Sequence, residues 1–265
     1  MFTKHTASAL ALAAAAALTL AACGGGDDDA PPAPCQGAGC NSGGGSGGGS
    51  GGGSSGGSVA ASILPEVIDF DAREELARPS ATVPLQLELE DARERDVSDP
   101  AAANVQVSIV SDTTGGARLS ASRLATRRGQ AGFSLTLGGT PGAVVVKATA
   151  DRSDNDVTNG IADELSWLLG MVSTQGGNGL NWELPAVVSA SAGRTVRLED
   201  ADDGFKPRSY AISGAPAAGL ALAECGDDVC LTVPTGTAAG SYDVTLSVTD
   251  AAASVLRMPV TVVVR

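Results

Sequence analysis

The chain has 265 residues and a formal net charge of −13, with 17 lysines and arginines against 30 aspartates and glutamates. This acidic balance argues against nucleic acid as a partner, because contacts to phosphates require a basic surface. Aromatic residues make up only 3% of the chain, which leaves little material for a sugar-binding aromatic platform.

Residues 1–22 have the layout of an export signal. Lys4 supplies a cation, and the uncharged stretch that follows is rich in alanine and leucine but too short for a comfortable membrane span. Removing this segment also removes His5, the only histidine. A chain without imidazole cannot build a Ser-His-Asp or Cys-His mechanism or a histidine-ligated zinc site. We therefore predict that the mature protein is not an enzyme.

Cys23 follows Leu20-Ala21-Ala22, and this pattern resembles the lipobox of bacterial lipoproteins. The resemblance implies a diacylated Cys23 as the mature amino terminus, so that lipid anchors the protein to a membrane. Gly24 rather than aspartate follows this cysteine, which implies the outer membrane under enteric-type lipoprotein sorting. The alternative is ordinary signal-peptidase cleavage near the same alanines, which leaves Cys23 as a free thiol.

Residues 23–58 are predicted to form a flexible tether. The segment has no apolar periodicity, and residues 42–58 are only glycine and serine. A coil of this composition and length has a root-mean-square reach of roughly 30 to 35 Å. The tether would let the folded part explore the space in front of a membrane.

The other four cysteines form two Cys-x4-Cys pairs, Cys35 with Cys40 and Cys225 with Cys230. An even number in an exported protein predicts two local disulfides. Zinc is the alternative, but this spacing is wider than the usual short knuckle, and the two pairs are far apart in the chain. A bridge that closes such a small loop contributes about 2 kcal/mol on the chain-entropy model.

Short alternating runs predict a β-sandwich over residues 59–156. In the run 83–90, apolar residues occupy one parity and polar residues the other. Similar runs at 105–109, 133–137 and 144–148 are separated by turns that contain glycine or proline.

Part of this region resembles the bacterial immunoglobulin-like domains of invasin and intimin type surface proteins. The resemblance rests on LELED at 87–91 before NVQV at 104–107, on TRRGQA at 126–131 before FSLTL at 133–137, and on TPG at 140–142. It implies an immunoglobulin-like sandwich. These are scaffold positions, so they say little about binding.

An acidic run follows these strands, with Asp151, Asp154 and Asp156 close together. Cadherins place a calcium-binding linker at the equivalent point, and calcium takes six to eight oxygen ligands. Asp200, Asp202 and Asp203 could add carboxylates. The prediction is a calcium site, and the alternative is a solvated acidic loop that needs no cofactor.

Residues 157–182 are predicted to be a linker with a short helix that begins after Asn159. The prediction rests on apolar residues spaced three and four apart. Trp167 and Met171 would then cover a sandwich end or the joint between two modules. The apolar residues are Ile161, Leu165, Leu168, Leu169 and Val172.

Alternating runs resume over residues 183–265 and predict a second sandwich. YAISGAP at 210–216, GLAL at 219–222 and GSYDVTLSVTD at 240–250 resemble the cadherin-like, immunoglobulin-like domains of bacterial surface proteins. Pro259 predicts that the last strand is an edge strand or carries a bulge. The fold class is therefore all-β, with two tandem immunoglobulin-like sandwiches.

Cys225 and Cys230 suggest a register for one hairpin of the second sandwich. If they lie opposite each other, Leu222 lies across from Val233, and both cysteines occupy one face. The other face then holds Leu220, Leu222, Val229, Leu231 and Val233.

Two sandwiches on a tether predict a non-catalytic lipoprotein of the cell envelope, at the periplasmic face or the cell surface. Its role would be adhesion or the binding of a protein or glycan through loops or a strand edge. One alternative is a periplasm-facing structural or assembly component. A carboxylate-dependent glycan hydrolase is a minor alternative, since two acids on a cleft can cleave glycosides.

Overall fold

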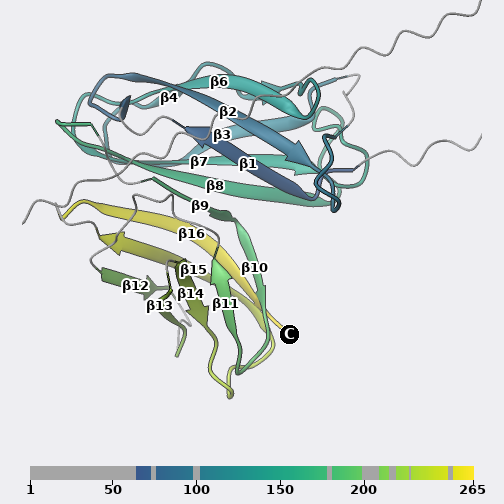
Figure 1. Ribbon diagram of the computed structural model, residues 1–265, viewed down its shortest axis with the longest axis vertical. Coiled ribbons are helices and arrows are strands. Elements are labelled where there is room, and N and C mark those ends of the chain that lie inside the picture. The colour runs from purple at the N-terminus through teal and green to yellow at the C-terminus, as the bar shows by residue number, and fades with distance from the viewer. Residues whose placement is uncertain are drawn as a thin grey trace, which may run out of the picture. The chain divides into compact units, whose positions relative to one another are not determined.

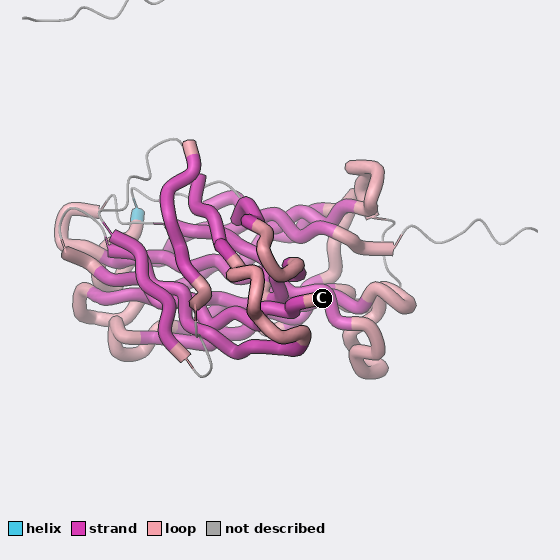
Figure 2. The backbone as a smooth tube through the Cα atoms, turned by 90° about the horizontal axis from the view of Figure 1, so that it is seen from below, coloured by secondary structure: helices cyan, strands magenta, loops and turns pink. Residues whose placement is uncertain are grey.

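The computed structural model describes residues 64–72, 76–97, 102–177, 181–198, 209–214, 219–226, 228–249 and 253–265. All of them fall in one compact unit, Gly56–Arg265. Its regular elements are strands (Figure 1), joined mostly by short loops (Figure 2). The predicted all-β class is confirmed. Among these residues, no helix has the length and apolar character that a membrane crossing requires.

The first sandwich has two antiparallel sheets in the described residues. One has the strand order β1-β2-β6-β4 and the other has the order β5-β3-β7-β8-β9. β1 and β9 are therefore edge strands of different sheets. The strands are β1 (Val67–Ala72), β2 (Thr82–Glu90), β3 (Val105–Asp112), β4 (Arg118–Leu119), β5 (Arg123–Leu124), β6 (Gln130–Thr136), β7 (Gly142–Asp151), β8 (Glu164–Ser173) and β9 (Asn181–Pro185).

Strand β2 shows why this sequence forms a half-buried sheet. Its apolar side chains alternate into the core, and Val83, Leu85, Leu87 and Leu89 are all buried, as their parity predicted. Burying one such aliphatic side chain stabilises the fold by about 1.5 to 3 kcal/mol. On β6 the same alternation buries Phe133 and Leu135 in the same core.

The predicted linker helix at 157–182 is wrong, because strand β8 occupies Glu164–Ser173 and β9 follows it in the same sheet. Alternate side chains of a strand point to opposite faces. Leu169 and Met171 of β8 enter the first core, whereas Leu168 and Val172 enter a second one. A strand buried on both faces thus carries apolar residues three and four apart, which imitates the spacing of a helix. Trp167 packs partly against the first core.

The second sandwich also has two sheets in the described residues, with the orders β10-β16-β15-β12 and β11-β14-β13. Strands β10 and β16 pair in parallel, and the other pairs are antiparallel. The strands are β10 (Val187–Ala190), β11 (Thr195–Leu198), β12 (Ser209–Ser213), β13 (Ala221–Cys225), β14 (Asp228–Thr232), β15 (Gly240–Thr249) and β16 (Val255–Val264).

The second core extends onto the first sandwich. Trp182 and Leu184 of β9 belong to the same buried cluster as Leu256 and Met258 of β16. Strand β16 contacts β7 and β8. Apolar side chains from both sandwiches fill one core, so the two sandwiches share a continuous interior and are not independent domains.

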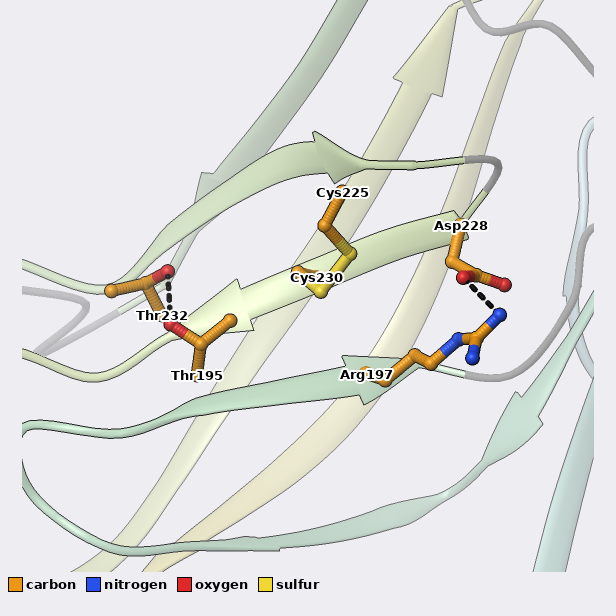
Figure 3. The surroundings of a disulfide bond; sticks show 6 residues. All are labelled: Thr195, Arg197, Cys225, Asp228, Cys230 and Thr232. Carbon is orange, nitrogen blue, oxygen red and sulfur yellow. Dashed lines mark hydrogen bonds and ion pairs between the residues drawn. A yellow bond between two sulfur atoms is a disulfide. The ribbon is translucent and has the colours of Figure 1, made fainter.

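The hairpin of β13 and β14 carries the disulfide between Cys225 and Cys230 (Figure 3), as predicted. The predicted parity is correct, because Leu222 lies opposite Leu231 and both cysteines are on the other face. The register itself is wrong by two residues, since Cys225 pairs with Asp228 and Cys230 pairs with Ala223. The bridge is therefore diagonal.

A tight turn sets this register. Only two residues separate Cys225 from Asp228, and Gly226 has a φ of +80°, which suits a two-residue hairpin loop. Arg197 of β11 forms an ion pair with Asp228 beside the bridge (Figure 3).

The prediction from Pro259 is wrong as well, because β16 lies inside its sheet between β10 and β15. The paired part of β10 begins opposite Thr261. Pro259 therefore precedes the segment in which β16 must donate to β10, so its missing N–H is tolerated.

Candidate functional site

A cleft of about 350 Å³ lies between the edge strands β1 and β9 of the first sandwich. Leu169 of the adjoining strand β8 also lines it, and β1 contacts β8 directly (Figure 1). A cleft of this size admits a side chain or a small molecule. Its walls are formed by Asp69, Phe70, Asp71, Ala72, Leu169, Asn181, Trp182 and Glu183.

Strand alternation presents two carboxylates of β1 on one face. Ile68 and Phe70 point into the first core, so Asp69 and Asp71 point away from it and are exposed. The two acids are two residues apart on the same face of one strand. A pair of negative charges therefore follows from the same pattern that builds the core.

Strand β9 places an amide and a carboxylate opposite β1. Trp182 is 1% exposed and Leu184 is fully buried in the second core, which gives Asn181 and Glu183 the opposite parity. The Glu183 Oε1 atom accepts a hydrogen bond of 3.0 Å from the backbone N–H of Phe70. This bond joins the two edge strands across the cleft.

Asn181 carries an unsatisfied acceptor in the wall. The residue is only 9% exposed, and its Oδ1 atom receives no hydrogen bond from the described residues. A buried polar atom without a partner costs about 1 to 3 kcal/mol, so such atoms are rare in folded proteins and call for an explanation. A hydrogen-bond donor from a ligand would remove this cost.

The acidic character continues from the cleft over β2. The pKa of Glu90 is raised by burial and by the neighbouring charges of Glu88, Glu94, Asp69 and Asp96. Like charges disfavour the ionised form of a carboxyl group. The surface beside the cleft therefore has a negative potential that attracts cations.

Of the predicted calcium ligands, Asp151, Asp154 and Asp156 are among the described residues. The described residues contain no group of three or more histidine, cysteine, aspartate or glutamate side chains that could hold a metal ion. Asp154 accepts hydrogen bonds from the backbone of Asp156 and from Asn159. Asp156 in turn accepts two from Thr158. Asp200, Asp202 and Asp203 lie outside the described residues.

Asp151 has a structural position instead. It ends β7, is 1% exposed, and accepts hydrogen bonds from the backbone N–H groups of Ser153, Ala162 and Asp163. It does not follow the last strand of its sandwich, because β8 and β9 come after it. Its carboxylate therefore holds the loop between β7 and β8.

Among the other predicted site residues, Cys225 and Cys230 form the disulfide described above. Cys23, Cys35 and Cys40 lie outside the described residues, as do the export signal and the tether.

The cleft residues were not predicted from the sequence. Alternation of Ile68 and Phe70 with Asp69 and Asp71 was a usable signal for β1, and Trp182 and Leu184 gave a similar one for β9. The sequence did not predict that β1 and β9 lie side by side, because 113 residues separate Phe70 from its partner Glu183.

Comparison with solved structures finds similar bacterial domains. The D0-D1 domain of intimin is 17% identical with a TM-score of 0.37, over 74% of this chain and 96% of that one. The D00-D0 domain of intimin is 20% identical with a TM-score of 0.30, over 43% and 51%. This chain thus spans about half of that fragment. FdeC, an Escherichia coli adhesin, is 18% identical with a TM-score of 0.29, over 75% and 64%.

These similarities concern the fold. Domains of intimin, which the sequence resemblance led us to expect, are among the structures found, but identities below 25% and TM-scores below 0.5 establish neither family nor function. No family model and no curated protein matches the chain.

Proposed function

We propose that the protein is a non-catalytic, lipid-anchored component of the bacterial cell envelope that binds a partner through the cleft between β1 and β9. Asn181 carries this proposal, because this residue of the cleft wall is only 9% exposed and its Oδ1 atom accepts no hydrogen bond from the described residues. Two strand edges and several acceptor groups meet at the same point. A folded domain that acts by contact needs only such a surface.

The sequence supports the anchor and the tether. Lipid on Cys23 would hold the chain at the membrane. The tether of residues 23–58 would let the folded part reach roughly 30 to 35 Å from this anchor. An anchor with a flexible spacer raises the local concentration of a binding module near the membrane, so a weak contact suffices for capture.

Replacing Cys23 with alanine should release the protein from the membrane fraction of the producing bacterium. Cys23 is the proposed lipid attachment site, so its replacement should leave the chain without an anchor. Fractionation followed by intact-mass analysis measures both the location and the acyl mass. The Cys40→Ala variant is the control, because it also removes a cysteine near the amino terminus but should remain membrane-bound. An unmodified Cys23 in the wild-type protein would establish ordinary signal-peptidase cleavage instead.

Binding through the cleft can be tested in intact cells with a photo-crosslinking residue at Asp71. An adduct with a partner is expected there, since Asp71 lines the cleft and is exposed. The same residue at Glu224, an exposed acid on β13, is the matched control and should give none. Equal labelling at both positions, or none at Asp71, contradicts a binding role for the cleft.

The two alternatives predict different behaviour. Proteases added to intact cells should release the sandwiches if they are displayed on the surface, whereas protection supports a periplasm-facing structural or assembly component. The carboxylates of Asp69, Asp71 and Glu183 are the residues that a glycan hydrolase would use. Release of reducing sugar by purified protein would support that alternative.

A further inference from the structure

We infer that the cleft between β1 and β9 receives an arginine side chain from an extended segment of a partner protein. This inference rests on the proposed function and deepens it by naming the chemistry of the partner.

Most of the polar side-chain groups in the cleft walls are acceptors, and the donors among them are the Trp182 indole N–H and the Asn181 amide nitrogen. Asp69, Asp71 and Glu183 contribute carboxylates to its walls, and ionised carboxylates only accept hydrogen bonds. The Oδ1 atom of Asn181 is also an acceptor, and no described residue donates to it. The three carboxylates repel phosphate, carboxylate and other anionic groups, and they favour a ligand that supplies several donors.

The charge of the surroundings selects a cation. The carboxylates of Asp69 and Asp71 project from the same face of β1, and the negative patch extends over β2 through Glu88 and Glu90. A neutral donor such as an amide would gain little from this potential. A cation is attracted toward the cleft and forms stronger, charge-assisted hydrogen bonds once it is bound.

Among cations, the guanidinium group matches the layout best. Its five N–H donors lie in one plane and point in fixed directions. They can reach acceptors on two different strands at once, whereas a lysine ammonium is a compact point charge. Glu183 already accepts the Phe70 N–H at Oε1, but a carboxylate offers about four lone-pair positions, so it can accept from both.

The backbone around the cleft suits an extended segment. The Phe70 N–H points outward from β1 toward β9, and backbone groups two residues apart on a strand point to the same edge. The groups of Ile68 and Ala72 therefore face this edge, which has no paired strand among the described residues. An extended partner segment can bond to the groups of Ile68 and Ala72, leave the Phe70 N–H to Glu183, and insert one side chain into the cleft.

The test uses the mature chain with Cys23→Ala, which keeps the protein soluble. The probe is a capped pentapeptide, Thr-Val-Arg-Val-Thr, titrated into isotope-labelled protein. Amide resonances of β1 and β9 should shift. The same peptide with citrulline, a neutral isostere of arginine, should bind about tenfold more weakly, and so should the lysine peptide, because charge and fork geometry both contribute.

Variants connect the binding to the cleft. Asp71→Asn should weaken the binding of the arginine peptide by about fivefold. The melting temperature of this variant should stay near the wild-type value, because Asp71 is exposed. Glu224→Gln removes the same charge from β13 and should leave affinity unchanged.

Several results would overturn the inference. Equal affinity for the citrulline or lysine peptide would exclude a guanidinium site. Displacement of the arginine peptide by millimolar calcium or magnesium would show that a metal ion occupies the cleft. If cells still give a crosslink at Asp71 while the arginine peptide fails to bind, only this inference fails. If both signals are absent, the proposed function fails with it.

Discussion

Replacing Gly170 with valine should lower the free energy of unfolding by about 3 kcal/mol, because overpacking a buried site costs about 1 to 3 kcal/mol and occasionally more. Gly170 lies in β8, in the face that packs on β16. A Cβ atom added there would overlap the Met258 Sδ atom and would lie 2.7 Å from the nearest Leu256 methyl carbons. Both neighbours are completely buried, so they have little room to move. Chemical denaturation with urea measures the loss.

A strand glycine elsewhere in the first sandwich provides the control. Gly132 of β6 is exposed, and an added Cβ atom meets nothing within 4 Å. Gly132→Val should be neutral or slightly stabilising, because valine favours strands. Adding Met258→Val to Gly170→Val should recover part of the loss by removing the nearest atom, the Met258 Sδ. If Gly170→Val is no more destabilising than Gly132→Val, the two sandwiches do not share a tightly packed interior.

The packing of β8 between two cores also explains why its sequence predicted a helix. Alternation predicts a strand only when one face meets solvent, as in β2, where Gln86 and Leu87 differ in polarity. In β8 both faces are covered, one by each core, so polarity no longer alternates. A helix and a strand buried on both sides cannot be distinguished by spacing alone.

Local information predicted the rest of the fold well. The parities of β2 and β6 and the bridge between Cys225 and Cys230 depend on neighbours in sequence. The predicted register of the hairpin was wrong because the register depends on the turn at Gly226, which has a positive φ. The cleft could not be predicted, because its walls come from edge strands of different sheets whose approach is decided by packing.

The acidic loop also shows how a pattern of residue types can have another cause. Three closely spaced aspartates predict calcium ligands, and calcium binding stays a prediction; in the structure their oxygens accept hydrogen bonds from their own loop. Aspartates are common at such places because their short side chains bond to the backbone two residues on.

Replacing Asp151 with asparagine should cost about 2 to 3 kcal/mol at neutral pH, because hydrogen bonds to a charged group contribute about 1.5 to 3 kcal/mol. Its Oδ2 atom accepts from the Ala162 N–H at 2.6 Å, and its Oδ1 atom accepts from the N–H groups of Ser153 and Asp163. An asparagine amide must turn an N–H₂ group toward one of these donors. Asp154→Asn is the control in the same loop; it is exposed and should cost less than about 1 kcal/mol.

The pH dependence identifies the charge as the cause. Burial acts to raise the pKa of Asp151, but hydrogen bonds from the Ser153 side chain and from the backbone of Ala162, Ser153 and Asp163 outweigh it and lower the pKa from 3.8 to about 2. A depressed pKa in the folded state stabilises the protein above pH 3.8, and this contribution is lost as the pH falls toward 2. The difference in unfolding free energy between wild type and Asp151→Asn should therefore be constant above about pH 5 and shrink at lower pH. Urea unfolding of both proteins from pH 7 to pH 2.5 measures it, and a difference that stays constant over this range would assign the effect of Asp151 to shape rather than charge.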